Sequence, residues 1–116
     1  MKPEKILDYA CMLAYAHWGR DSRKRFSVAA VAKRSSGPWV CSVNSSSVDR
    51  APRAHAECRI VGKLDRGVTV YVARPMADGT WGMAKPCPGC RIALRAFGVK
   101  KVYYTISQGN YGVMVP

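Results

Sequence analysis

The first pattern along the chain is a helical one. Between positions 3 and 18, apolar residues recur three or four positions apart, at Ile6, Leu7, Ala10, Leu13, Ala14 and Trp18. Residues at this spacing share one face of an α-helix, so the pattern predicts an amphipathic helix over residues 3–18. Met12 falls off this face. Gly19 and the charged residues 20–25 are typical of a loop that ends such a helix.

The rest of the chain alternates between strand and helix patterns. Apolar runs predict strands over 26–32, 39–43, 68–73, 101–106 and 111–115. Turn-forming residues at 35–38 and 107–110 predict two hairpins, and helices are predicted over 54–64 and 91–97 with a loop over 74–86. This order, α-β-β-α-β-α-β-β, predicts a single α/β domain over 1–116. We expect a mixed sheet covered by helices, with ligands bound where helices begin beyond strand ends.

Composition narrows the class of protein. The chain has 116 residues, of which 48% are hydrophobic. It lacks an uninterrupted apolar run of about 18 residues, so no membrane span is expected. The first residues resemble no signal peptide, and the five cysteines form an odd set without disulfide-like spacing. These features favour a reduced, cytoplasmic protein.

The net charge of the chain suggests a class of binding partner. Nineteen Lys and Arg against seven Asp and Glu give a net charge of +12. Such an excess attracts phosphate, whether on a free nucleotide or along a nucleic-acid backbone. The candidate contacts are Arg20, Arg23, Lys24, Arg25, Arg50 and Arg53. A solvated basic surface without a specific partner is the alternative interpretation.

Two short motifs carry the chemistry. His55-Ala56-Glu57 precedes Pro86-Cys87-Pro88-Gly89-Cys90 by about thirty residues. One imidazole and two thiolates suit zinc better than magnesium, calcium or manganese, and three protein ligands leave a tetrahedral zinc with an open position. We therefore predict a catalytic zinc on His55, Cys87 and Cys90, with Glu57 as the acid–base group. The pattern H-x-E followed by P-C-x-x-C is the signature of zinc deaminases.

Other roles for these residues stay open at this point. Cys87 and Cys90 alone would also fit a redox dithiol. Cys58, three positions after His55, could complete a closed structural site with one His and three Cys. Elsewhere, His17 is expected to be structural or to lie at the surface. Cys11 and Cys41 are expected to be buried thiols on apolar faces.

With the motifs placed, the chain resembles the cytidine deaminase superfamily. Residues 26–30, F-S-V-A-A, are similar to the family's F-P-V-G-A-A strand, and residues 86–91 are similar to P-C-G-x-C-R. The resemblance implies a three-layer fold with a five-stranded mixed sheet, helices on both faces and an antiparallel last strand. It also implies substrate contacts from Phe26, Asn44 and Ala56, and an Arg91 that offsets ligand-thiolate charge.

Two residues depart from the pattern of the free-nucleoside enzymes. Those enzymes usually have Cys where this chain has His55, and a ribose-binding Glu where it has Ser46. His at the first position is usual in deoxycytidylate, tRNA and polynucleotide deaminases. The departures leave the chemistry intact but weaken the inference about sugar recognition.

The resulting hypothesis is a Zn²⁺-dependent hydrolase that converts cytosine to uracil in a free (deoxy)cytidine nucleoside or nucleotide. A deaminase of single-stranded DNA or RNA is the first alternative, and a non-enzymatic zinc-stapled nucleic-acid-binding domain is the second. By analogy with compact nucleoside deaminases, a homo-oligomer, a tetramer, is expected.

Overall fold

The structure is a computed structural model that describes residues 2–20, 26–44 and 55–116. Its elements are α1 (Pro3–Arg20), β1 (Ala29–Lys33), β2 (Trp39–Val43), α2 (Ala56–Ile60), the 3₁₀ turn η2 (Val61–Lys63), β3 (Thr69–Pro75), β4 (Trp81–Gly82), α3 (Pro88–Ala96), β5 (Lys101–Ser107) and β6 (Asn110–Met114). None of the helices in these ranges is both long and apolar enough to cross a membrane.

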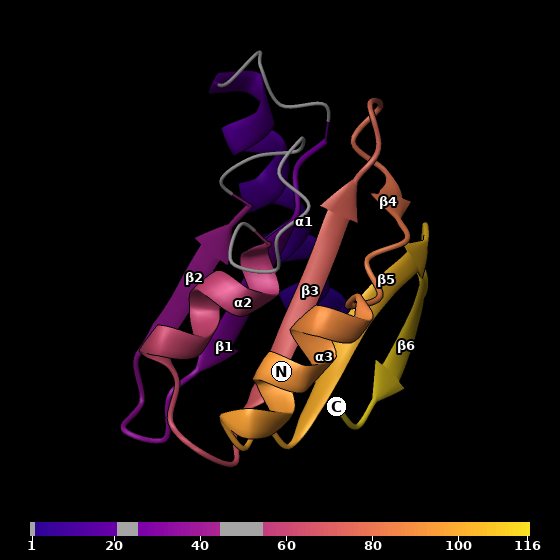
Figure 1. Ribbon diagram of the computed structural model, residues 1–116. Helices are drawn as coiled ribbons and strands as arrows, with labels where there is room; N and C mark the ends of the chain where they lie inside the picture. Colours follow the sequence, from indigo (N-terminus) through magenta and orange to yellow (C-terminus); the bar gives the residue numbers. More distant parts are fainter. Residues whose placement is uncertain (1, 21–25, 45–54) are drawn as a thin grey trace.

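The strands form one mixed sheet in the order β2-β1-β3-β5-β6 (Figure 1). β3 and β5 run parallel, whereas β1 pairs antiparallel with both β2 and β3. β6 pairs antiparallel with β5, which confirms the predicted antiparallel last strand. The two-residue β4 pairs with the end of β3 and adds a short sixth strand within the predicted 74–86 loop. The α/β fold with a mixed sheet is therefore confirmed.

Helices cover both faces, which makes the fold three-layered. Figure 1 shows α2 and α3 in front of the sheet and α1 behind it. The period of two along each strand divides the core accordingly. Towards α2 and α3 lie Ala30, Ala32, Val70, Val72, Leu94 and Val102. Towards α1 lie Leu7, Ala10, Ala14, Ala29, Val31 and Ala73.

Helix boundaries differ from the predicted ones. The helix predicted over 91–97 begins earlier, at Pro88, because proline suits the first helical turn and the Cys87 side chain caps the helix. Gly98 follows its end with a φ of 75°, a conformation that favours glycine. The helix predicted over 54–64 is shorter, ending at Ile60 before a 3₁₀ turn. The first strand is predicted from residue 26 but pairs from Ala29.

The predicted burial of Cys41 is wrong. Cys11, on α1, is buried, as predicted, but Cys41 is exposed on β2. β2 is an edge strand, and α1 packs mainly on β3 and β1; the cluster under α1 includes Val43 at the end of β2 but not Cys41. An apolar run in the sequence thus identified the strand but not its place at the edge of the sheet.

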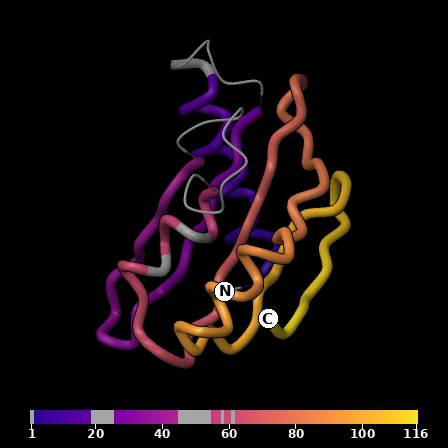
Figure 2. Tube along the Cα trace, in the orientation of Figure 1, coloured from indigo at the N-terminus to yellow at the C-terminus, as the bar shows by residue number. Residues whose placement is uncertain are grey.

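The two ends of the sheet are built differently. The β1–β2 turn and the turns leading into β3 and β5 gather at one end, the lower end of the trace in Figure 2. The first residues of α2 and α3 lie towards the other end, at which β3 finishes (Figure 1). Helix starts beyond a strand end are where α/β folds commonly bind ligands.

Candidate active site

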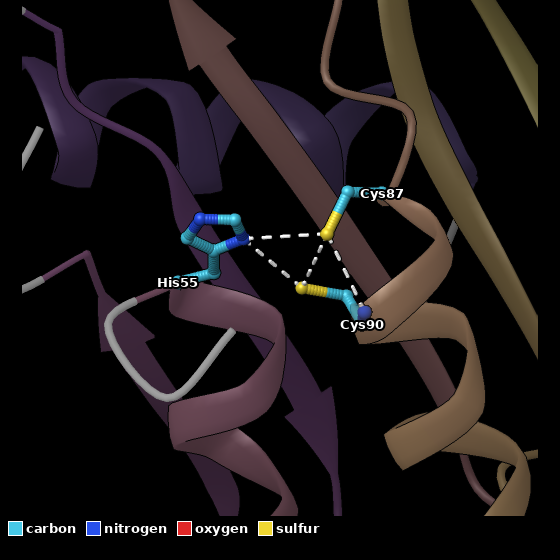
Figure 3. A group of neighbouring side chains, drawn as sticks. All are labelled: His55, Cys87 and Cys90. Atoms are coloured by element: carbon cyan, nitrogen blue, oxygen red, sulfur yellow. Dashed lines mark hydrogen bonds between the residues drawn. The ribbon is translucent and has the colours of Figure 1, made fainter. Parts of the chain in front are cut away.

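Three side chains from the two sequence motifs meet over β3. The His55 Nδ1 atom lies 3.2 Å from the Cys90 Sγ atom and 3.5 Å from the Cys87 Sγ atom. The two sulfur atoms are 3.3 Å apart. Figure 3 shows the three donor atoms turned towards one another across the gap between α2 and α3. The structure thus brings together the three residues predicted as zinc ligands.

The local structure of each helix start positions these donors. The His55 carbonyl accepts a hydrogen bond from the Arg59 backbone N–H, which fixes His55 just before α2. The Cys87 Sγ atom accepts one from the Cys90 backbone N–H at 3.4 Å, so Cys87 caps α3 and Cys90 lies in its first turn. Backbone N–H groups and the partial positive charge of the α3 N-terminus favour thiolates here.

The triangle of donors matches what zinc requires. Zn–S distances near 2.3 Å and Zn–N distances near 2.0–2.1 Å give a tetrahedron whose donor–donor edges are about 3.5–3.8 Å. The edges in the structure, 3.2, 3.3 and 3.5 Å, lie within a few tenths of an ångström of this range. The donor set, one imidazole and two thiols, is also one that zinc favours. The residues present therefore fit a zinc ion held by these three ligands, the only metal-binding group found among the described residues.

Glu57 is buried beside these donors. Its exposed fraction is 6%, and it hydrogen bonds with Cys90. Burial raises the pKa of the Glu57 carboxyl, while a backbone hydrogen bond, the nearby His55 and the contact with Cys90 act in the opposite direction. A buried carboxyl group next to metal donors is suited to exchanging protons with a reacting molecule.

Arg91 lies in α3 directly after Cys90. Its backbone N–H donates to the Cys87 carbonyl, and its half-buried side chain has a buried Nε atom that finds no hydrogen-bond partner among residues 2–20, 26–44 and 55–116. A guanidinium at this position adds positive charge next to the two cysteines, in the direction that favours thiolates.

Asn44 fastens the segment that carries Phe26. The Asn44 Oδ1 atom accepts from the Val28 backbone N–H at 2.9 Å, and its Nδ2 group donates to the Phe26 carbonyl at 3.3 Å. The Asn44 side chain is 2% exposed, so both ends of its amide are used inside the protein. Ala56 is also fully buried, and its carbonyl accepts from the Ser42 hydroxyl.

Arg74 is a neighbour that sequence reasoning missed. Its guanidinium carbon lies 5.1 Å from the centre of the Phe26 ring, a cation–π contact. It follows Val70 and Val72 on the same side of β3, so it belongs to the face that α2 and α3 cover. The alternation along β3 could have placed it on this face, but not against a ring from residue 26.

Several sequence-based predictions fall outside the described residues. These are Ser46 and the basic residues Arg23, Lys24, Arg25, Arg50 and Arg53. The side chains of Arg20 and Cys58 are not described either.

Comparison with known proteins agrees with this geometry. Residues 2–106 match the family described as the cytidine and deoxycytidylate deaminase zinc-binding region. A search among curated proteins finds no significant match.

Solved structures share the fold at low sequence identity. A cytidine deaminase from Burkholderia pseudomallei is 20% identical, with a TM-score of 0.59 over 92% of this chain and 90% of that one. A mutant cytidine deaminase from Mycobacterium tuberculosis is 22% identical, with a TM-score of 0.52 over 90% of this chain and 88% of that one. By the family match across nearly its whole length, the chain belongs to the cytidine and deoxycytidylate deaminase zinc-binding family.

Proposed function

We propose that this protein is a zinc-dependent hydrolase that deaminates cytosine to uracil in a free (deoxy)cytidine nucleoside or nucleotide. The observation that carries the proposal is the triangle of His55, Cys87 and Cys90 donor atoms, with the buried Glu57 carboxyl beside it. Membership of a deaminase family supports zinc-dependent deamination in general. The assignment of a small substrate, a free nucleoside or nucleotide, goes beyond what the family match supports.

The proposed roles follow from the chemistry of each group. His55, Cys87 and Cys90 would hold zinc, which when bound supplies a Lewis acid that makes water nucleophilic at neutral pH. Glu57 would accept a proton from the water that attacks ring carbon C4 of cytosine. It would then deliver protons to ring nitrogen N3 and to the departing amine. One C–O bond forms and one C–N bond breaks, so water and cytosine give uracil and ammonia without any redox partner.

Substrate positioning rests on the Phe26 segment. The ring of Phe26 is held from one side by Arg74, and its backbone is held by Asn44. Because both ends of the Asn44 amide are engaged, we expect Asn44 to act on substrate binding chiefly through Phe26. Direct substrate contacts of Phe26, Asn44 and Ala56 remain predictions, as do a cytoplasmic location and a homo-oligomer.

A deaminase of single-stranded DNA or RNA is the second candidate. The net charge of +12 favours it, since a polymer of phosphates would be attracted to this surface. A zinc-stapled binding domain without activity is a weaker candidate, because a structural site does not need the buried Glu57 carboxyl.

Elemental analysis and a substrate panel test the proposal. We expect one zinc per chain and conversion of at least one of cytidine, deoxycytidine or their 5′-monophosphates. Cys87→Ser and Cys90→Ser should lose both zinc and turnover, whereas the matched control Cys41→Ser, an exposed thiol, should keep both.

Two results would contradict the proposal. Absorption of the cobalt-substituted protein that indicates three sulfur ligands would point to a closed structural site that includes Cys58. Deamination confined to cytosine in an oligonucleotide would establish the second candidate instead.

A further inference from the structure

One end of the sheet, on the face towards α1, presents a row of aromatic and basic side chains. In the pairing register Lys33 lies opposite Trp39, Tyr71 opposite Tyr103, and Thr69 opposite Lys101. Alternation along the strands places all six on the same face as Val31 and Ala73. We call this set the sheet-end band: Lys33, Trp39, Thr69, Tyr71, Lys101 and Tyr103.

The aromatic rings of the band form a stack with an open side. Tyr71 and Tyr103 lie 5.2 Å apart between ring centres, with an angle of 7° between their planes. Next to Tyr71 is a surface hollow of about 490 Å³, lined by Ile6, Lys33, Trp39, Thr69 and Tyr71. Trp39 is 47% exposed across this hollow. Flat rings beside an open hollow can accept another flat ring.

The lysines of the band have no acidic partner in the described part of the chain. Neither Lys33 nor Lys101 forms an ion pair with a carboxylate among the described residues. The Lys101 ammonium instead lies 5.2 Å from the centre of the Tyr103 ring. Lys2 and Lys5 are exposed at the start of α1, close in sequence to Ile6, which lines the hollow. Two acidic groups near the band have other partners: Glu4 hydrogen bonds with Tyr111, and Asp65 accepts from Arg34 and Ser35. The band is thus positive and aromatic together.

We propose that the sheet-end band binds single-stranded nucleic acid. Proteins that bind single strands without sequence preference combine cations for the phosphates with aromatic rings on which bases stack, often across a sheet face. A second copy of the chain fits less well. A two-fold contact through this band would bury its unpaired lysines against those of the partner, and burying unpaired charges is costly.

This surface is separate from the candidate active site. The metal donors lie on the opposite face of the sheet, near the end of β3, whereas the band lies at its beginning. The bases of a nucleic acid that stack on the band are therefore not the bases that could lie at Cys87 and Cys90 of the same chain. The band anchors the protein on nucleic acid, and the inference holds whichever substrate the active site uses.

Fluorescence anisotropy with oligomers that contain no cytosine tests the inference without any contribution from turnover. The probes are labelled 12-nucleotide oligothymidylate and oligouridylate, which also show whether DNA or RNA is preferred, with a 12-base-pair duplex for comparison. The zinc-loaded protein should bind a single strand more tightly than the duplex. In Lys33→Gln/Lys101→Gln, the slope of log affinity against log salt should decrease in magnitude by about 1.4, from two lost phosphate contacts.

Two further variants test the contribution of base stacking in the band and of positive charge outside the band. Trp39→Leu should weaken single-strand binding by about 5- to 150-fold, the range expected for the loss of one stacked base. Lys63→Gln/Lys85→Gln removes the same charge from exposed positions outside the band and should leave the slope unchanged. Zinc content and urea midpoint verify that each variant is folded.

Three outcomes would overturn the inference. Equal effects of the two lysine pairs would mean that charge alone attracts the strand. Duplex binding as tight as single-strand binding would exclude stacking. Failure of both oligomers to bind, with a concentration-dependent dimer that Trp39→Leu abolishes, would assign the band to a second copy of the chain.

Discussion

The two faces of the sheet use polar groups in opposite ways. Towards α2 and α3, at the end of β3, Glu57 and Asn44 are buried, and the donors His55, Cys87 and Cys90 converge on one point. Towards α1 lies a cluster of buried apolar residues, and the polar groups of the sheet-end band lie side by side beyond it at the end of the sheet. Convergent buried groups suit chemistry on one small molecule, whereas a flat open row suits an extended partner.

The energetic demands of the two regions differ as well. Buried polar groups at the candidate active site need partners, and most have them: Asn44 binds the backbone at both ends of its amide, and Glu57 bonds with Cys90. In the band, Lys33 is exposed and keeps its hydration, and the half-buried Lys101 lies against the Tyr103 ring, so neither needs an acidic partner in the free protein. Substitutions should therefore affect turnover or stability at the first region and partner binding at the second.

The largest effect is expected at Glu57. Glu57→Gln keeps the size of the side chain but removes its ability to take up a proton, so turnover should fall by at least about 10²–10⁴-fold. Zinc content and binding of oligothymidylate should stay unchanged, because neither depends on the carboxylate. Steady-state kinetics with elemental analysis measures this. Turnover within tenfold of the original protein would show that Glu57 is not the acid–base group.

The variant Lys33→Gln/Lys101→Gln makes the opposite test, because it changes the sheet-end band and leaves the candidate active site intact. It should lose salt-sensitive oligonucleotide binding while turnover of a small substrate is retained. If either variant impaired both properties, the two regions would not be independent.

A smaller effect is expected at Asn44. Asn44→Ala leaves the buried Val28 N–H and the Phe26 carbonyl without their partner, so the free energy of unfolding should decrease by about 1–3 kcal/mol. KM should rise more than kcat falls, because the Phe26 segment loses its support. Urea unfolding and kinetics measure these changes. Asn110→Ala, at the exposed start of β6, is the matched control. An equal decrease in the free energy of unfolding in that variant would show that Asn44 has no special role in stability.

The smallest effect on stability and turnover is expected from alkylation of the exposed Cys41 on the edge strand β2. Burial, followed by the charge of Asp8, raises the pKa of the Cys11 thiol to about 11. At pH 8 roughly one Cys11 in a thousand is then a thiolate, the reactive form. Iodoacetamide should therefore label the exposed Cys41 before Cys11, without loss of turnover. Peptide mapping by mass spectrometry measures the order, and early labelling of Cys11 would contradict the described packing of α1.

Much of the candidate site follows from the sequence alone. The donor types and spacing of His55, Cys87 and Cys90 predicted a zinc site, because zinc favours this set of ligands, and the structure brings the three donors together. The periods of the apolar residues likewise determined the alternation of helices and strands. Both are local properties, readable within a few neighbouring residues.

Tertiary structure decided what depends on residues distant in the chain. Periodicity assigns a residue to one side of a strand, but it does not reveal which strand lies at the edge or how far a helix extends over the sheet. For this reason Cys41 was expected to be buried and is exposed. The same reason explains why the contact of Arg74 with Phe26 and the row from Trp39 to Lys101 emerge only when strands from separate parts of the sequence are in register.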